Sequence, residues 1–341
     1  MPVAEASERR GEHAKPGAGS VPSLALITAA LMLMMVLASM EQTVTVTALP
    51  TIIGELRGLQ YYAWVQATYL LAATVVMPLY GRLADVLGRK RVIMAAVTLF
   101  VIGSILSSFA HSMQQLIGFR IIQGLGAGGI MPVVLTILGD IFTIQQRARV
   151  QGCFSAVWGT SALAGPWLGA YLVKYLGWRS IFWVNWPFGL LGLAVLAFVY
   201  HDREKPHSTE LDLMGIGALA TGAGGLLLFL SLLGQPDAAA KVLYAICPRS
   251  VESLVSQLAA AWIVLAGLGL VTVVAGVFFY YHEQRTKNPV LPPALFFQRA
   301  IGPALVCSLL LGLCFISVET WVPLYVQGGG RAERPTMRPG L

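Results

Sequence analysis

The sequence predicts an all-α fold, a polytopic bundle of membrane-spanning helices. Of its 341 residues, 56% are hydrophobic and only 11% are charged, and the mean hydropathy is +0.71. Soluble domains carry about 25% charged residues, so this chain lacks the charge to cover a globular surface. The apolar residues gather in long runs, and Lys and Arg lie mostly between these runs. Lipid is therefore the expected solvent for much of the chain.

Nine apolar runs are long enough to cross a bilayer core, which takes about 20 residues of helix. Because the bilayer core offers no water to an unpaired backbone, each run is expected to be helical. The predicted spans are residues 23–49, 61–80, 92–110, 115–139, 150–172, 180–200, 213–233, 259–281 and 300–326.

The positions of Lys and Arg indicate how the spans are oriented. If the N-terminus is cytoplasmic, most Lys and Arg fall in cytoplasmic segments, as the positive-inside rule requires. We therefore expect a multi-pass protein of the plasma membrane with a cytoplasmic N-terminus. The net charge of +7 then belongs to loops beside the bilayer. The lipid bilayer is an expected partner, and nucleic acid is not.

Changes in composition divide the chain into five predicted parts. The polar start is expected to be a disordered cytoplasmic tail, and the last residues form a polar segment of the kind that a frameshift or early stop leaves. The parts are a cytoplasmic tail (1–22), a six-helix N-terminal bundle (23–200), a two-helix linker insert with cytoplasmic loops (201–299), the first helix of an incomplete C-terminal bundle (300–327) and an aberrant polar tail (328–341).

A segment of glycines, one acid and several bases connects the second and third predicted spans. Its glycines permit a tight turn between two packed helices. Asp85 is expected near the start of the third span, where the helix dipole favours a carboxylate. A capped positive-inside loop is the plainer interpretation. The order of glycine, acid and bases is nevertheless specific, at Gly81, Asp85, Gly88, Arg89, Lys90 and Arg91.

Arg120 is the costliest residue in the chain, because an Arg inside a span costs about 2.5–3.5 kcal/mol or more unless it is paired or hydrated. Arg120 and Glu41 both fall in the outer half of their spans, so each can be the other's partner. The alternatives are that Arg120 extends to the outer headgroups, and that Glu41 lines a hydrated vestibule without titrating.

Small residues interrupt the fifth predicted span. Pro166 follows Gly165 and removes a backbone donor, so the helix can bend there. Gly165 and Gly169 share a small-residue face that suits either close packing or a functional kink. Residues 124–129 match the pattern G-x-G-x-x-G, but they follow no strand and lie inside a span. We therefore expect helix packing there and no bound nucleotide.

Glu319 in the ninth span is a second acid within an apolar run, and it is expected either to be a second proton site or to be solvated near the outer end. The sequence shows no metal-ligand spacing and no pairing of a nucleophile with a base. We therefore expect no cofactor, no metal and no enzymatic activity.

Taken together, these segments resemble the major facilitator superfamily. Residues 81–91 resemble the signature loop of that family, residues 116–124 its fourth-helix motif and residues 164–169 its antiporter motif. Residues 41–52 and 178–187 resemble motifs of the fourteen-helix drug:proton antiporters, the EmrB/QacA type. The chain departs from that branch in having Glu in place of the usual first-helix Asp, and in lacking most of a second half.

The resemblance implies a proton-coupled antiporter that exports small amphipathic or cationic compounds by alternating access, as in multidrug efflux. Its partners would be protons and a small-molecule substrate. Glu41, Arg120 and Glu319 would couple transport to protons, and Gly165, Pro166 and Gly169 would form the antiporter motif. A conformational-switch loop would be made by Gly81, Asp85, Gly88, Arg89, Lys90 and Arg91. The alternative is a truncated, non-transporting membrane protein or subunit that lacks the second half. The substrate and the oligomeric state stay open.

Overall fold

The computed structural model describes residues 21–58, 61–202, 212–233 and 257–286, together with Gln298 and most of 301–314. Every regular element in this part of the chain is a helix, so the predicted all-α class is confirmed. The chain divides into two compact units, residues 1–279 and 280–341. The first unit contains all the helices discussed below, apart from the last turns of α11.

The helices follow one another with short connections over the first 200 residues. In chain order they are α2 (Val21–Leu56), α3 (Tyr62–Leu87), α4 (Arg89–Ser108), α5 (Met113–Ile141), α6 (Ile144–Leu176), α7 (Ser180–Trp183), α8 (Asn185–Val199), α9 (Leu213–Leu233) and α11 (Gln257–Arg285).

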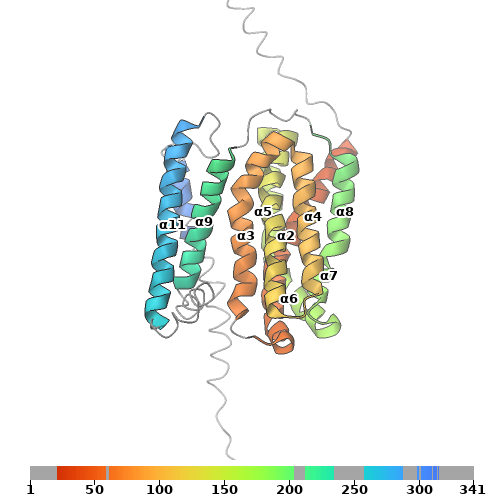
Figure 1. Ribbon diagram of the computed structural model, residues 1–341. Helices are drawn as coiled ribbons and strands as arrows, with labels where there is room; N and C mark the ends of the chain where they lie inside the picture. The colour runs from red at the N-terminus through yellow and green to blue at the C-terminus, as the bar shows by residue number, and fades with distance from the viewer. Residues whose placement is uncertain are drawn as a thin grey trace, which may run out of the picture. The chain divides into compact units, whose positions relative to one another are not determined.

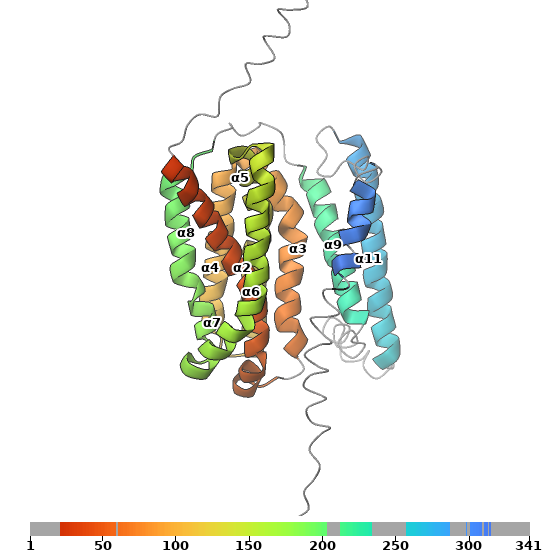
Figure 2. The ribbon, with the colours of Figure 1, turned by 180° about the vertical axis from the view of Figure 1, so that it is seen from behind.

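The first six long helices form a bundle (Figures 1 and 2). α5 packs between α3 and α4, while α2 packs against α6 and α8. α9 lies beside α3, with α11 on the far side of α9. Consecutive long helices run in opposite directions, so the end of α3 and the start of α4 share one end of the bundle with the end of α5. Leu56, Tyr62 and Leu176 lie at the opposite end.

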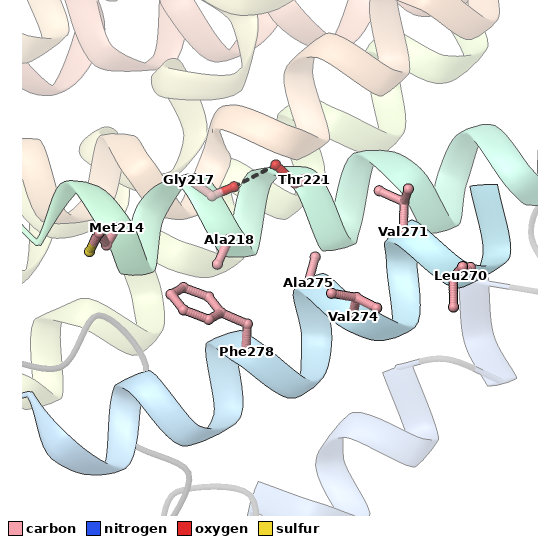
Figure 3. A pocket seen from close by; sticks show the side chains of 9 residues that line it. All are labelled: Met214, Gly217, Ala218, Thr221, Leu270, Val271, Val274, Ala275 and Phe278. Atoms are coloured by element: carbon pink, nitrogen blue, oxygen red, sulfur yellow. Dashed lines mark hydrogen bonds between the residues drawn. The ribbon is translucent and has the colours of Figure 1, made fainter. Parts of the chain in front are cut away.

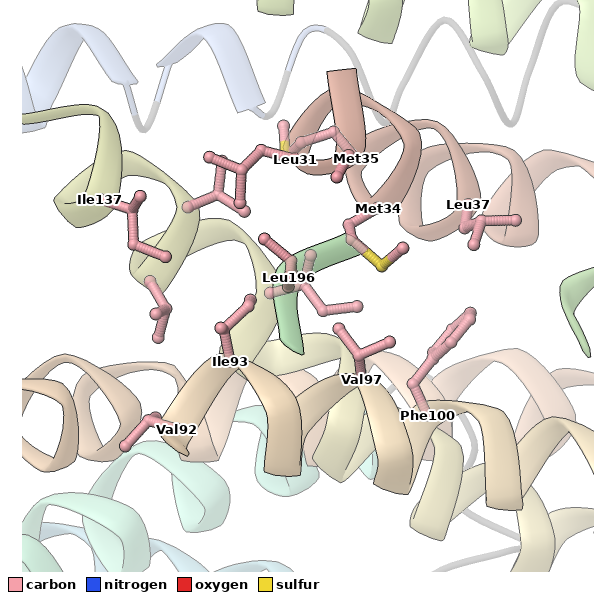
Figure 4. Packing of buried hydrophobic residues seen from close by; sticks show 14 of the residues in the cluster. Leu31, Met34, Met35, Leu37, Val92, Ile93, Val97, Phe100, Ile137 and Leu196 are labelled. Carbon is pink, nitrogen blue, oxygen red and sulfur yellow. The ribbon is translucent and has the colours of Figure 1, made fainter. Parts of the chain in front are cut away.

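The largest buried cluster joins α2, α4, α5 and α8 (Figure 4). Leu31, Met34 and Met35 of α2 meet Ile93, Val97 and Phe100 of α4 and Leu196 of α8. Between membrane helices the hydrophobic effect contributes little, so close packing and buried polar contacts hold the bundle together.

Glycines let α5 approach both of its neighbours closely. A Cβ added at Gly124 or Gly128 would overlap backbone carbonyls of α3, and one added at Gly126 would overlap the backbone of Phe100 in α4. The G-x-G-x-x-G pattern is therefore a helix-packing surface, as the sequence predicted.

Within the described residues, seven helices are long and apolar enough to cross a membrane. The fifth predicted span is helical, but α6 is less apolar than the others because Gln, Ser, Thr and Gly interrupt it. The sixth predicted span is divided after Trp183 into α7 and α8. Of the ninth, the described residues between 301 and 314 are helical.

The junction between α3 and α4 differs from the prediction. We expected Asp85 near the start of the third span, but α3 continues through Gly81 and Asp85 and ends at Leu87. The turn is made at Gly88 alone, whose φ of 93° suits glycine. Asp85 is exposed in the last turn of α3, where the helix dipole does not favour a carboxylate.

Candidate functional site

A buried ion pair joins α2 to α5. The guanidinium of Arg120 donates to Oε1 of Glu41 through its Nη1 atom. Arg120 is 0% exposed and Glu41 is 3% exposed. The structure therefore brings together the acid and the base that the sequence placed at similar depths, and Arg120 does not extend to the headgroups.

Neutral oxygens and an aromatic ring complete the surroundings of Arg120. Its other donors reach Oε1 of Gln123 at 2.9 Å, Oε1 of Gln66 at 3.2 Å and the carbonyl of Val65 at 3.4 Å. The guanidinium carbon lies 4.1 Å from the centre of the Tyr69 ring, which adds a cation–π contact. A buried cation is thus paired and hydrogen-bonded, as burial of a charge requires.

The Glu41 carboxylate accepts hydrogen bonds from two further side chains, Thr45 and Asn185. Thr45, one turn along α2, donates to Oε1 at 2.9 Å, alongside Arg120. Asn185 at the start of α8 donates to Oε2 at 2.6 Å. Residues of α2, α5 and α8 therefore converge on one carboxylate.

The predicted antiporter motif, Gly165, Pro166 and Gly169, lies against the helix that carries Glu41. A Cβ added at Gly165 would overlap the side chain of Thr43, and one added at Gly169 would lie 3.1 Å from the carbonyl of Val44. The two glycines thus allow α6 to pack closely on α2 within one turn of Glu41. Pro166 lies inside α6 between these two contacts.

The match of the chain to a known family decides its assignment. The family model described as Major Facilitator Superfamily matches residues 31–331. The chain belongs to the major facilitator superfamily. Members of this superfamily are membrane transporters and not enzymes, in agreement with the sequence-based expectation.

Among curated members of the superfamily, the chain is similar to two proteins of Bacillus subtilis (strain 168). It is 31% identical to multidrug transporter protein MdtP over 303 residues, which are 89% of this chain and 52% of that protein. It is 30% identical to multidrug resistance protein 3 over 307 residues, which are 89% of this chain and 56% of that protein. The chain therefore spans about half the length of these relatives.

A solved structure of the human organic anion transporter MFSD10 (TETRAN) is similar at 15% sequence identity with a TM-score of 0.48. The match covers 75% of this chain and 72% of that one.

The predicted switch loop of this superfamily member contributes to contacts between helix ends. Arg89, the first residue of α4, pairs with Asp140 in the last turn of α5. Lys90 donates from Nζ to the carbonyl of Ala197 at 2.6 Å, and its backbone N–H donates to Asp202 at 2.9 Å. The acid at the start of α4 is thus Asp202 and not Asp85. Arg91 is exposed.

The remaining site residues fall into two groups. Glu319 lies outside the described residues. Asn185, Gln123, Gln66 and Tyr69 contact the ion pair but were not predicted as site residues. The signal that could have found them is the presence of uncharged polar side chains in otherwise apolar runs, which is weaker than the signal of a charge.

A separate pocket of about 510 Å³ lies between α9 and α11 (Figure 3). Its one side-chain hydroxyl, that of Thr221, donates to the carbonyl of Gly217 at 2.7 Å. With no charged side chain in its lining, the pocket offers space for apolar groups only. The lining residues are Met214, Gly217, Ala218, Thr221, Leu270, Val271, Val274, Ala275 and Phe278.

Proposed function

We propose that this chain takes part in proton-coupled antiport of small amphipathic or cationic compounds across the plasma membrane, as in multidrug efflux. One observation carries the proposal. Glu41 and Arg120 form an ion pair that is buried within the helical bundle. Ionisable residues at membrane depth are costly, and they commonly mark proton relays or substrate pathways.

The proposed coupling works through the charge of Glu41. A proton on Glu41 neutralises the carboxylate and ends its ion pair with Arg120, so the contacts between α2 and α5 weaken. This favours one orientation of the helical bundle. Loss of the proton restores the negative charge and lets a cationic or amphipathic substrate compete for the site. Alternating access then carries proton and substrate in opposite directions.

Other residues have supporting roles in this proposal. The switch-loop residues, Asp85 among them, set the balance between conformations, and Gly165, Pro166 and Gly169 limit leakage during exchange. Glu319 is a second candidate proton site. We place the chain in the fourteen-helix drug:proton antiporter branch with its N-terminus in the cytoplasm, and α9 and α11 are then inserted linker helices.

A second candidate function is a membrane protein or subunit that does not transport without a second half. The residues of this chain align with 52% and 56% of the two Bacillus relatives, and they include one complete helical bundle of the first half. Alternating access needs two bundles that enclose a shared site in turn.

Reconstitution of the purified chain separates the two candidates. Proteoliposomes with an imposed pH gradient would be tested for uptake of cationic and amphipathic dyes and for the accompanying proton flux. Antiport predicts dye-dependent proton flux in wild type and its loss in Glu41→Gln. Glu55→Gln is the matched control, because Glu55 is a half-exposed acid on the same helix. Absence of flux in wild type favours the second candidate, and wild-type flux in Glu41→Gln contradicts the assigned role of Glu41.

A further inference from the structure

Asn185 links the Glu41 carboxylate to a second polar side chain. Its Nδ2 atom lies 2.6 Å from Oε2 of Glu41 and 2.9 Å from Oγ of Ser104 on α4. Ser104 in turn donates to the carbonyl of Phe182 in α7 at 2.9 Å. Asn185 is 5% exposed and Ser104 is 0% exposed, so these hydrogen bonds form a buried chain across four helices.

The start of α8 is positioned for these contacts by its sequence. Gly189 follows Asn185 by one helical turn, and a Cβ there would overlap the side chain of Val101 on α4. A Cβ at Gly192 would overlap the side chain of Met34 on α2. The two glycines share a face with Asn185, so they bring α8 close enough to α4 and α2 for one amide to reach both Ser104 and Glu41.

The ionised and the protonated forms of Glu41 need different hydrogen-bond partners from the Asn185 amide. An ionised carboxylate only accepts hydrogen bonds, whereas a protonated carboxyl also donates one. Arg120 and Thr45 both donate to Oε1, so Oε2 is the oxygen that can take a proton without facing a cation. With a proton on Oε2, that proton and the N–H of Asn185 Nδ2 would be two donors facing each other across the same 2.6 Å contact.

Rotation of the Asn185 amide removes this conflict. A half-turn about the bond from Cβ to Cγ exchanges Oδ1 and Nδ2 with almost no change in shape. Oδ1 then accepts from protonated Oε2, and it also accepts from Ser104 once that hydroxyl turns away from the Phe182 carbonyl. Both protonation states of Glu41 are then hydrogen-bonded within the same packing.

Among the described residues, Arg120 is the charged group that faces Glu41, so a change in the charge of Glu41 acts mainly on Arg120 and the amide of Asn185. Arg120 faces Glu41 from α5, and Tyr69 faces Arg120 from α3. α4 and α8 contribute only the uncharged Ser104 and Asn185 to this contact. When Glu41 is neutral, Arg120 keeps the amide oxygens of Gln123 and Gln66 as acceptors.

We propose that Asn185 and Ser104 are positioning residues that stabilise Glu41 in both its ionised and its protonated form, through rotation of the Asn185 amide. The inference rests on the proposed function, because it requires that Glu41 takes up a proton from water during the cycle. It adds a means by which Glu41 can take up a proton in a tightly packed site while its Oε2 atom keeps a hydrogen-bond partner.

Infrared difference spectroscopy of the full chain in lipid tests the proposal. A carboxyl C=O band that appears as the pH falls, and is absent in Glu41→Gln, belongs to protonated Glu41. In Asn185→Leu this band is expected at higher frequency, because the carboxyl group has lost its acceptor.

Ser104→Ala provides a second variant in case Asn185→Leu does not fold. It should move the band in the same direction by a smaller amount. Ser107→Ala is the matched control, because Ser107 is also buried on α4 but donates to Gly103 within its own helix at 2.8 Å. A Glu41 band that is unchanged in Asn185→Leu, or equally affected by Ser104→Ala and Ser107→Ala, overturns the inference alone. The absence of any Glu41 band in wild type overturns the proposed function as well.

Discussion

Gly165 of α6 lies directly against Thr43 of α2, two residues beyond Glu41. A Cβ added at Gly165 would overlap the Thr43 side chain at its Oγ1 atom. Thr43 has little freedom to turn away, because its hydroxyl donates to the Met40 carbonyl at 3.1 Å within α2. The predicted antiporter motif therefore packs directly against the helix segment that carries the proposed proton site.

We predict that Gly165→Ala separates α6 from α2 and destabilises the protein. The expected cost is about 1–3 kcal/mol, as for other overpacked sites. Thermal unfolding of the purified protein in detergent measures it. Gly159→Ala on the same helix is the control, because a Cβ there would meet no atom within 4 Å.

A compensating variant tests the cause of this effect. Thr43→Ala removes the overlapping Oγ1 atom, so the Gly165→Ala/Thr43→Ala double variant should recover part of the lost stability. Equal stability of the single and double variants would show that the Thr43 contact is not the source of the loss.

The Glu41–Arg120 pair predicts an asymmetric double-mutant cycle. Arg120→Met leaves a buried carboxylate without its cation, which should cost about 3–5 kcal/mol. Adding Glu41→Gln removes that charge, so the double variant should unfold at a higher temperature than Arg120→Met alone.

The Glu55–Arg179 pair is the control for this cycle, because it also joins α2 to another element but has side chains 50% and 31% exposed. Its coupling energy should stay below about 1 kcal/mol. Additive effects of Glu41→Gln and Arg120→Met would contradict a coupled pair.

The fold could be predicted from the sequence mainly because long apolar runs leave few alternatives to membrane helices. Helix ends were less predictable, since they depend on tertiary contacts. Gly81 and Gly88 look equivalent in the sequence, yet only Gly88 adopts a positive φ. The helix therefore continues past Asp85, and Asp202, more than 100 residues away, occupies the position expected for that acid.

The candidate site could be predicted only in part, because the contacts of uncharged side chains also depend on tertiary packing. Glu41 and Arg120 could be matched because a buried charge requires a partner, and few charges lie inside the spans. Asn185 carries no charge, so burying it in the apolar run 180–200 costs less than burying a charge. Its presence in the sequence therefore does not predict a particular partner. Its contact with Glu41 depends on how α8 packs against α2 and α4, which the sequence pattern did not reveal.

The glycines of α5 give a prediction with a matched control on one helix. Gly126→Ala would place a methyl group against the backbone of Phe100 and Ala96, which cannot move as a side chain can. We expect a loss of about 1–3 kcal/mol or more in the free energy of unfolding. Gly118→Ala should be neutral or stabilising by up to about 1 kcal/mol, since its Cβ would meet nothing within 4 Å. Similar losses in both variants would point to helix flexibility instead of packing.

Asp140 and Asp85 both lie at the end of the bundle where α4 begins. Their Asp→Asn variants are expected to differ, because the first should lower stability and the second should change only transport. Asp140 pairs with Arg89, and each of these side chains is 17% exposed, so Asp140→Asn removes a mostly buried charge partner. The expected loss is about 1–2 kcal/mol, between the values for exposed pairs and for buried hydrogen bonds to charged groups. Asp85 is exposed, so the same Asp→Asn change there should leave the unfolding temperature unchanged.

Transport should respond to Asp85 in a different way. Because Asp85 lies at a helix end, distant along α3 from the Tyr69 level of the ion pair, Asp85→Asn should lower the rates for all dyes by the same factor. Initial rates for several dyes in proteoliposomes, each divided by the wild-type rate, provide the measurement. A changed ranking of substrates would instead assign Asp85 to substrate selection. An unfolding temperature lowered as much as in Asp140→Asn would assign it to the structural contacts at that end, where Arg89 and Lys90 already join α4 to α5 and α8.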